Sequence, residues 1–559
     1  MINNDVQIQF GTSNTERLDD MLFGNDGYLY ISGDVNAGSW SSNFNVIDAG
    51  TSSSGALVAK INPQTFAVEW ASFLGTSSYA YANAIAQDNN NNIYISGYAG
   101  NSFTNYSPLD ATGKSFVAKY DANGNRLWMT QEGTGSGDAI RGIATDNNGN
   151  VYAAGNAIGA VNGETAIGNS DLYIVKYDTN GTVLWTKQFG SSGTDAHKYA
   201  VIQNNFLYTI GRVGGTIEGN THQGDSDAFV SKFDLDGNLI WIKTIGTSGF
   251  DASYGIVVDN SGSIYITGST EGSLEGSNAG NKDAFVAKLN NNGDLQWTQQ
   301  FGTNKDDLAR RIALSNDQQR IYLTGYTKGN IDGASSADSD NDYFFSWYDT
   351  DGNQEGITQN GTTSAEISQA IAVSKSDEIF VGGHTFGTLI SGQNQGNFDL
   401  FLHSFQPVNS CNTAGSTLAD LNVSVSNTLV WYDAATDGNQ LATSTALVDG
   451  TTYYAANSDG SCESDRLAVT VCVLAANECP TDGASPLQNL TQEISDNNTS
   501  IDLTTAFIDS NGDALSYSLV SNTDSNIAST SFSGSGNSLE IDYVAIGTTT
   551  ITIQASDGI

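Results

Sequence analysis

The sequence has little proline, positive charge, cysteine or histidine. Its 559 residues include 5 Pro, 21 Lys and Arg, 4 Cys and 4 His, against 61 Asp and Glu and a formal net charge of −40. A surface of that sign repels phosphate backbones and anionic lipid. The composition therefore argues against nucleic-acid binding and leaves metal cations, neutral sugars and basic partners open.

Long apolar runs are missing as well. No window approaches the ~18 consecutive apolar residues of a membrane span, so we expect none. The opening MINNDVQIQFG lacks the basic start and apolar run of a signal peptide. We therefore expect either a signal peptide that was removed or a fragment of a longer protein.

Catalytic motifs are missing too. The sequence has no G-x-S-x-G elbow, H-E-x-x-H or P-loop, so it predicts no catalytic residue. With 61 acids, a pair of carboxylates for glycoside hydrolysis stays open.

Cysteine is confined to the C-terminal quarter. The four are Cys411, Cys462, Cys472 and Cys479. An even number in one region favours disulfides formed in an oxidising compartment. A zinc site is the alternative, but six residues separate Cys472 from Cys479 and no histidine lies near them in the sequence.

What the sequence does contain is a repeat. The phrase Tyr-Ile-Ser-Gly, or a close variant, begins at Tyr30, Tyr94, Tyr152, Tyr208, Tyr265, Tyr322 and Phe380. Each unit reads as four short strands joined by tight turns such as DNSG and NNNG. Seven units of four strands predict an all-β fold with a seven-bladed β-propeller. A solenoid is the alternative, and it needs capping repeats that we do not find.

The two ends of the repeat region are complementary. Residues 6–11, VQIQFG, are a fourth-strand phrase alone, and the last unit stops after its third-strand phrase at 399–405. The first strand is therefore predicted to complete the last blade and close the ring, which removes exposed sheet edges. A tryptophan five residues before the Gly that ends the fourth strand is predicted to pack between blades. These residues are Trp70, Trp128, Trp185, Trp241 and Trp297.

The phrases GIVVDNSGSIYITG and DAFVAKLNNNGDLQW carry a resemblance to the bacterial SBBP family of β-propeller repeats. The resemblance covers roughly residues 1–407. It implies a secreted or surface-exposed protein and no particular chemistry.

Two smaller β-sandwich modules are predicted after the propeller. Residues 408–474, with WYDAATDG, TTYYA and CESDRLAVTV, resemble Ig-like modules of bacterial adhesins and gliding-associated surface proteins. That resemblance implies a Cys411–Cys462 pair and leaves Cys472–Cys479 as a second bridge. Residues 480–559 resemble cadherin-like repeats of bacterial surface proteins. The sequence stops where that family normally has another strand, so we expect a fragment of a tandem array.

A calcium site is one hypothesis for the last module. In DSNGD, Asp509, Asn511 and Asp513 stand at alternate positions around a Gly turn, which suits Ca²⁺, and Asp557 is a further candidate. The twelfth position is Val520 rather than a bidentate Glu. A plain Asx turn is therefore the favoured alternative.

Acidic residues also recur in the propeller. Five residues past the Gly that ends the fourth strand stand Glu16, Asp138, Asp195, Asp251, Asp307 and Glu366, with Ala80 in the remaining unit. A second series precedes the third strand at Asp171, Asp227, Asp283, Asp342 and Asp399. Both are predicted near the mouth of the channel. Each acid either orders its own loop through backbone N–H groups or binds a divalent cation. Recurrence favours the first, and the cation hypothesis rests on Asp138, Asp195, Asp251 and Asp307.

Aromatic residues break the symmetry of the first two units. The candidates for a ligand-binding surface are Trp40, Phe44, Tyr79, Tyr81, Phe103 and Tyr106. Rings among Asn and Ser suit sugars or a partner surface. The alternative is that the rings pack beneath their own loops.

Together these features predict an extracellular or surface binding and adhesion protein, with the propeller as head and the two modules as stalk. The expected partner is a glycan or a surface protein, bound by a chain that is monomeric within a longer parent. Ca²⁺ is the expected ion, and no organic cofactor is expected. A secreted polysaccharide-active enzyme and a non-binding spacer are the alternatives.

Overall fold

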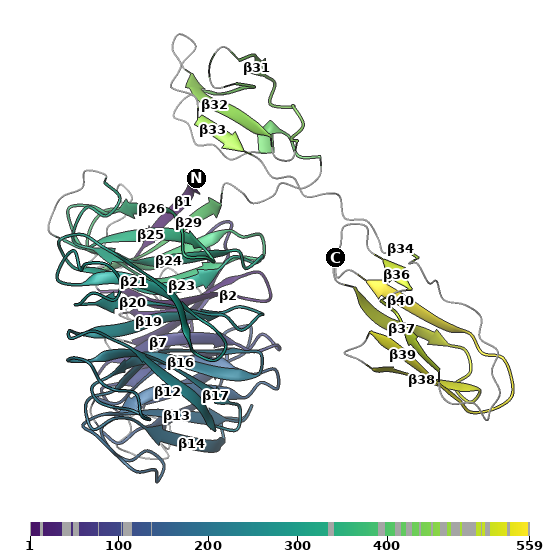
Figure 1. Cartoon of the computed structure of the whole chain (residues 1–559), viewed down its shortest axis with the longest axis horizontal. Helices are drawn as coiled ribbons and strands as arrows, with labels where there is room; N and C mark the ends of the chain where they lie inside the picture. Colours follow the sequence, from purple (N-terminus) through teal and green to yellow (C-terminus); the bar gives the residue numbers. More distant parts are fainter. Residues whose placement is uncertain are drawn as a thin grey trace. The chain divides into compact units, whose positions relative to one another are not determined.

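The chain is all-β, as predicted, and divides into two compact units, Met1–Ser410 and Cys411–Ile559. The computed structural model (Figure 1) describes residues 2–11, 15–35, 46–48, 55–76, 78–101, 103, 115–135, 137–333, 340–389, 397–407, 415–420, 428–434, 436, 438–448, 451–458, 467–470, 481–482, 499–504, 506–508, 515–533 and 537–556. Each unit is described by itself.

Within the described residues, the first unit consists of seven sheets of four or five strands. The first sheet holds β2 (Arg17–Phe23), β3 (Leu29–Val35), β5 (Gly55–Ile61), β6 (Val68–Gly75) and the short β4 (Val46–Asp48). The second holds β7 (Ala80–Gln87), β8 (Ile93–Ala99), β9 (Ser115–Tyr120) and β10 (Arg126–Glu132). The third holds β11 (Ala139–Thr145), β12 (Val151–Ala157), β13 (Asp171–Tyr177) and β14 (Val183–Phe189).

The other four sheets repeat the same antiparallel order. The fourth holds β15 (Ala196–Gln203), β16 (Phe206–Val213), β17 (Asp227–Asp234) and β18 (Leu239–Ile245). The fifth holds β19 (Asp251–Val258), β20 (Ile264–Thr270), β21 (Asp283–Leu289) and β22 (Leu295–Phe301). The sixth holds β23 (Asp307–Leu314), β24 (Arg320–Thr327), β25 (Asp342–Asp349) and β26 (Gln354–Asn360). The seventh holds β27 (Glu366–Val373), β28 (Ile379–Thr385), β29 (Asp399–Pro407) and β1 (Ile2–Phe10).

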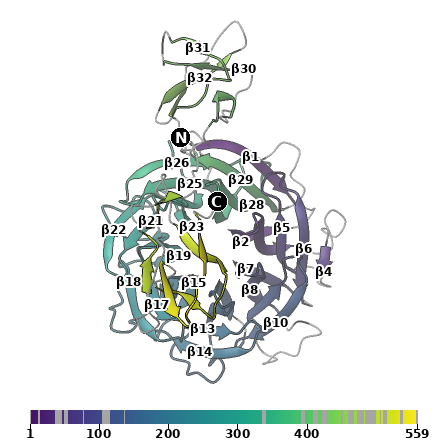
Figure 2. The same ribbon diagram turned by 90° about the vertical axis from the view of Figure 1, so that its right-hand side faces the viewer.

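The sheets follow one another around a common centre (Figure 2). We call the first strand of each sheet its inner strand. The inner strands are β2, β7, β11, β15, β19, β23 and β27. Each contacts the inner strand of the next sheet, and β27 contacts β2. At the rim of the seventh sheet, β1 pairs antiparallel with β29, with Ile8 opposite Leu402. This is the pairing predicted for the first strand.

The hairpins between third and fourth strands are tight turns, as their sequences predict. In the turn from β9 to β10, Asp121 Oδ1 accepts the N–H groups of Asn123 and Asn125, both at 2.9 Å. Gly124 completes the turn with φ 84°, a left-handed conformation that glycine adopts without a steric penalty.

The predicted tryptophans pack between neighbouring sheets. Trp128 of β10 donates Nε1–H to the carbonyl of Thr179, at 3.0 Å, in the hairpin of the third sheet. Its ring lies 5.9 Å from Tyr94 of its own sheet and 6.3 Å from Tyr177 of the next, between ring centroids. A Cβ on Gly181 would lie 2.9 Å from this ring, so the hairpin fits closely over the indole. The prediction of packing between units is confirmed here.

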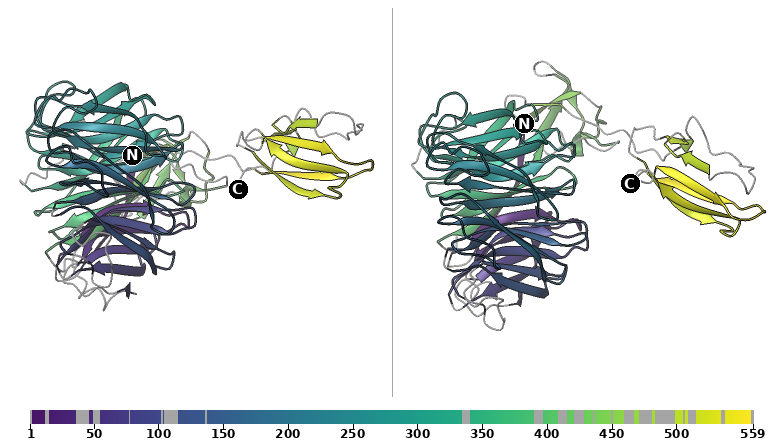
Figure 3. Two further views of the ribbon diagram at one scale, coloured as in Figure 1. Left: turned by 90° about the horizontal axis from the view of Figure 1, so that it is seen from below. Right: turned by 60° about the horizontal axis from the view of Figure 1, so that its bottom comes forward.

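The second unit contains smaller sheets. Residues 415–470 include η1 (Leu418–Asp420) and one sheet in the order β31 (Gln440–Leu441), β30 (Thr428–Tyr432), β32 (Thr452–Ser458), β33 (Leu467–Thr470). Residues 481–556 form three more sheets, seen from two directions in Figure 3. They pair β34 (Thr481–Asp482) with β36 (Phe507–Ile508), β35 (Thr499–Asp502) with β39 (Ser538–Tyr543) and β38 (Ala528–Ser533), and β37 (Ser516–Asn522) with β40 (Ile551–Ser556).

Several predictions for the second unit lie outside the described residues. They concern the four cysteines and the calcium candidates Asp509, Asn511, Asp513 and Asp557. These stay predictions, and so do the boundaries of the two modules.

The packing of Trp128 between sheets leads to a stability prediction. Replacing it with Ala removes the contacts with two sheets and one hydrogen bond, so we expect Trp128→Ala to lower the free energy of unfolding by about 3 kcal/mol. Leu127 is its neighbour in β10 and is 52% exposed, so Leu127→Ala is the control and should change little. Chemical denaturation measures both. Equal effects of the two substitutions would contradict the packing role.

Candidate functional site

The acids that follow the fourth strands order their own loops. Asp195 is buried and accepts the N–H of Ser191 at 2.5 Å and that of Gly214 at 2.9 Å. The same bond from the residue four positions earlier recurs in other units. It joins Thr134 to Asp138, Thr247 to Asp251, Thr303 to Asp307, and Thr362 to Glu366. The carboxylates thus satisfy backbone donors that would otherwise be buried without a partner.

The second acidic series has a similar role. Asp171 accepts the N–H groups of Ile167 and Gly168, both at 2.7 Å, and the side-chain amide of Gln188 at 2.8 Å. Asp283 accepts the corresponding bonds from Ala279, Gly280 and Gln300. In the part of the chain that the structure describes, no three His, Cys, Asp or Glu residues are grouped to hold a metal ion. These contacts agree with the loop-ordering hypothesis, and cation binding at these acids stays a prediction.

Three tyrosines gather near the start of β7. Tyr79 is 41% exposed, and its ring centroid lies 5.3 Å from Tyr81 and 6.2 Å from Tyr98. Tyr81 and Tyr98 are half-buried neighbours at 5.0 Å. Tyr79 and Tyr81 are sequence candidates that the structure brings together. Tyr98 is a third member that the sequence did not single out, although its position in β8 varies from unit to unit.

The remaining aromatic candidates do not join this group. Phe103 is buried, with 5% of its surface exposed, and packs on Phe116 at 5.3 Å between centroids. Its burial agrees with the alternative hypothesis, in which the ring packs beneath its own loop. Trp40, Phe44 and Tyr106 lie outside the described residues.

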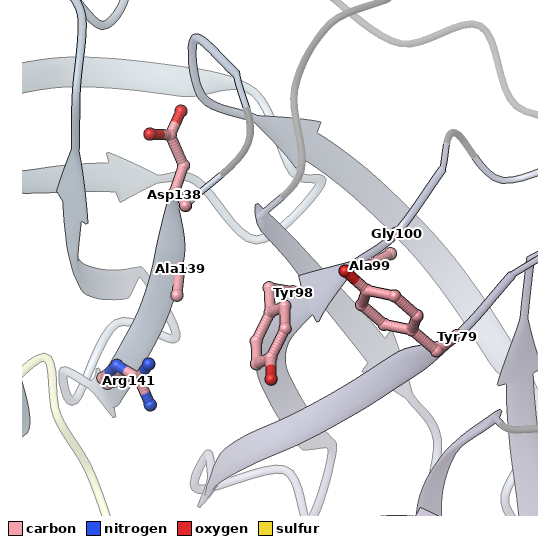
Figure 4. Close-up of a pocket in the computed structure, with 8 residues that line it drawn as sticks. Tyr79, Tyr98, Ala99, Gly100, Asp138, Ala139 and Arg141 are labelled. Atoms are coloured by element: carbon pink, nitrogen blue, oxygen red, sulfur yellow. The ribbon is translucent and has the colours of Figure 1, made fainter.

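A pocket of about 250 Å³ opens beside the tyrosines, and we call it the tyrosine pocket. It is lined by Tyr79, Tyr98, Ala99, Gly100, Gly137, Asp138, Ala139 and Arg141. Figure 4 shows the carboxylate of Asp138 and the guanidinium of Arg141 at opposite ends of a short segment. Aromatic faces with a few fixed polar groups are typical of small-molecule sites.

The two charged groups of the pocket differ in availability. Asp138 accepts bonds from the backbone of Thr134, Gly135 and Ile158, so its own loops engage it. Arg141 makes no hydrogen bond or ion pair among the described residues, and burial lowers its pKa. Arg141 is therefore the group most free to meet a ligand.

Three of the four histidines are core residues. His197 is buried, with Nδ1 2.8 Å from the carbonyl oxygen of Gly155 and Nε2 3.0 Å from Oγ1 of Thr209. Burial lowers its pKa to about 4 and that of His384 to about 3. His403 is also buried, with its pKa lowered to about 4. All three are neutral at pH 7 and serve packing.

The loop-ordering role of the acids gives a prediction that separates it from metal binding. Asp195→Ala would leave the N–H groups of Ser191 and Gly214 without this hydrogen-bond acceptor, so we expect the free energy of unfolding to fall by about 3 kcal/mol. EDTA and Ca²⁺ should leave the effect of this substitution unchanged. A Ca²⁺-induced rise in melting temperature that Asp195→Ala removes would favour the cation hypothesis instead.

Comparison with known protein families identifies two kinds of domain. The Ig-like domain described as CHU_C associated matches residues 403–474, and the SBBP beta-propeller repeat matches residues 127–161 and 240–275. These matches confirm the SBBP and Ig-like resemblances. The cadherin-like resemblance and a bacterial origin stay predictions.

Individual relatives are distant. The regulatory protein FlaEY of Caulobacter vibrioides is 25% identical over 239 residues, which is 38% of this chain and 25% of that protein. An uncharacterized WD repeat-containing protein of Acanthamoeba polyphaga mimivirus is 22% identical over 352 residues, which is 47% of this chain and 25% of that protein. The chain thus spans about a quarter of the length of these relatives.

Among solved structures, Drosophila Plexin A in complex with Semaphorin 1b matches with a TM-score of 0.41 and 10% identity, covering 80% of this chain and 95% of that one. Among the described residues, no helix is both long and apolar enough to span a membrane. The chain combines beta-propeller repeats with an Ig-like domain, an architecture typical of surface and extracellular proteins.

Proposed function

We propose that this is a surface or extracellular binding protein that recognises a carbohydrate at the tyrosine pocket. In this proposal the first unit is a seven-bladed β-propeller, with each sheet as one blade and β1 closing the ring in the seventh. The unbroken cycle of contacts between inner strands supports that architecture.

The tyrosine pocket is the observation that carries the carbohydrate proposal. Flat aromatic faces pack against the apolar C–H faces of sugar rings, and hydroxyl, carboxylate and guanidinium groups bond to sugar hydroxyls. Tyr79 leaves much of its surface open, while Tyr81 and Tyr98 support it from two strands. The three tyrosines belong to a single unit of the repeat. A binding site that occurs once in a repeat protein needs such a group of residues, which the other units lack.

The second unit is proposed as a stalk, with a surface protein as the other class of partner. Its disulfides and the Ca²⁺ ligands of the last module are expectations from the sequence alone. Both would stiffen small sandwiches whose cores are limited. Thiol titration of the unfolded chain, with and without reductant, tests the disulfides.

A polysaccharide-active enzyme is the second candidate, and Asp34 favours it. Asp34 is buried in β3, and its Oδ1 has no hydrogen-bond partner among the described residues. Burial, and then the charge of Asp19, raises its pKa to about 8. A carboxylic acid that keeps its proton at neutral pH is what a general acid needs. Turnover of a polysaccharide that Asp34→Asn abolishes would establish this function.

The binding proposal predicts saturable binding on a glycan array. Tyr79→Ala and Tyr98→Ala should weaken the wild-type affinity at least about tenfold, because each removes a ring that would face the sugar. Leu295→Ala is the control. Leu295 is 51% exposed in the outer strand β22, so its loss removes a similar exposed apolar group away from the pocket.

Two results would contradict the proposal. One is the absence of any saturable glycan binding by the wild-type protein. The other is binding that the two tyrosine variants retain at full strength.

A further inference from the structure

Every inner strand of the first unit carries one β-bulge, at the same place in each sheet. The pairing of the inner strand with the second strand skips one residue, which is left unpaired in the ladder. The seven skipped residues are Asp19, Asn83, Arg141, Lys198, Tyr254, Arg310 and Gln369. They vary from sheet to sheet, and only arginine occurs twice, at Arg141 and Arg310.

Five basic residues meet around these bulges, and we call them the cation cluster. They are Arg17, Arg141, Lys198, Arg212 and Arg310. Arg141, Lys198 and Arg310 are bulge residues, while Arg212 stands opposite Ala196 and Arg17 opposite Asp34 in the adjoining pairs. All five are half-buried. Their strands belong to four different sheets.

The charges of the cluster act on one another across the centre of the unit. Burial, together with the charges of Arg141, Arg310, Arg212 and Arg311, lowers the pKa of Lys198 to about 7. Burial lowers the pKa of Arg141, Tyr98 and Asp19 oppose this effect, and the charges of Arg310 and Arg212 add to it. Strands far apart in the sequence thus bring these groups within electrostatic reach.

Among the described residues, no carboxylate forms an ion pair with the cluster, although Asp19 interacts electrostatically with Arg17 and Arg141. None of the five forms a hydrogen bond or ion pair through its side chain with another described residue, and the buried Nε of Arg310 has no partner there. Yet the chain has 61 acids for 21 Lys and Arg, so paired cations should be easy to obtain. Unpaired cations in a partly buried place cost stability, which points to a role other than folding.

Aromatic rings hold the cluster in part. The guanidinium of Arg310 lies 5.0 Å and the ammonium of Lys198 lies 5.6 Å from the ring centroid of Tyr254. Such contacts stabilise a cation by about 1 kcal/mol without removing its charge or its N–H donors. The donors therefore stay available.

A bonded layer lies one residue further along the inner strands. Asp20 of β2 accepts Nε–H of Arg311 at 3.4 Å and the hydroxyl of Tyr199 at 3.2 Å, and the Arg311 guanidinium lies 4.6 Å from the Tyr199 ring centroid. The side chains come from the first, fourth and sixth sheets, so they span the centre. The other four sheets have Ala84, Gly142, Gly255 and Ala370 at this position. Asp20, one residue beyond the bulge of β2, is thus already engaged with Arg311.

The other nearby acid is Asp19, which accepts Nε2–H of Gln369 at 3.1 Å. Burial raises its pKa to about 6, against the lowering effect of Arg311, Arg17 and Arg141. With Asp34 as well, the cations around the bulges still outnumber the acids. Arg141 also lines the tyrosine pocket, so the pocket and the cluster share this residue.

We propose that the cation cluster is a binding site for an oxyanion, the carboxylate or sulfate of an acidic sugar whose ring lies in the tyrosine pocket. Guanidinium groups bind such oxyanions through paired N–H donors. The overall charge of −40 repels long polyanions, so the ligand is one acidic sugar residue rather than a highly charged polymer. The sugar part rests on the proposed function, while the oxyanion part rests on the cluster alone.

The test uses two probes that differ in one carboxylate, cellobiouronic acid and neutral cellobiose, together with inorganic sulfate. Calorimetry on the full chain at constant ionic strength should give at least about tenfold tighter binding of the acid. Sulfate should compete with it. Lys198→Met and Arg310→Met should each remove most of this preference. Lys243→Met is the matched control, because Lys243 pairs with Asp294 at the surface, with its side chain 40% exposed.

Thermal unfolding provides a second readout. Since Lys198 and Arg310 are unpaired cations among like charges, both Met variants should fold and melt at or above the wild-type temperature without anion. Sulfate should raise the wild-type melting temperature more than that of the variants. A purely structural role for either residue would lower the melting temperature instead and would contradict the proposal.

The outcomes separate the two proposals. Stabilisation by sulfate that needs the cluster, without binding of either sugar, would keep the oxyanion site and overturn the carbohydrate function. Equal binding of acid and neutral sugar, unaffected by the Met variants, would keep the carbohydrate function and overturn the oxyanion site. No response to any probe would overturn both.

Discussion

The β-bulge in each inner strand is the constraint on which the interior of the first unit depends. A regular strand alternates its side chains between two faces. Where a neighbouring sheet packs closely on a face, it restricts the size and polarity of the side chains there. The extra residue of a bulge stands outside that pairing. Flanking residues such as Leu18 and Ile140 can therefore stay buried and apolar while the bulge residue beside them carries a charge. The bulge thus allows similar sheets to contribute different groups at one position.

Repetition and variation separate structure from function in this unit. Residues that recur, such as Trp128 and Asp195, satisfy backbone groups or fill the space between sheets, and most units have them. Their polar atoms are engaged by hydrogen bonds. The groups that do not recur in most sheets, Arg141 and Lys198 among them, have no bonded partner in the described part of the chain, and Arg141 also lines the tyrosine pocket. The two kinds of position have opposite effects on the free energy of unfolding. The recurring residues raise it, and the unpaired cations lower it.

Much of the fold could be predicted from the sequence because its determinants are local. The spacing of the repeat, the turn residues and the alternation of apolar side chains predict four strands per unit, and VQIQFG predicts the pairing of β1 with β29. The packing of Trp128 between sheets was also predicted from the sequence, and so was the choice of Tyr79 and Tyr81 as candidates. The loop acids were recognised, and their bonds match the favoured hypothesis.

The cation cluster could not be predicted in the same way. A bulge is defined by the register with a partner strand, which no single strand shows. Arg141, Lys198, Arg212 and Arg310 lie in different units and meet only because the sheets surround a centre. The burial of Phe103 could not be predicted from its own loop, because it depends on the next strand, where Phe116 packs against it. The variable column in the first strands was visible in the repeats, and it is the signal that could have identified the cluster.

A crystal structure of the protein soaked in bromide tests the central claim most directly, because the anomalous scattering of bromide shows where an anion binds. The account predicts a bromide among Arg141, Lys198 and Arg310, with their side chains directed at it. Side chains that instead pair with Asp19 or Asp34, with no anion between them, would contradict it.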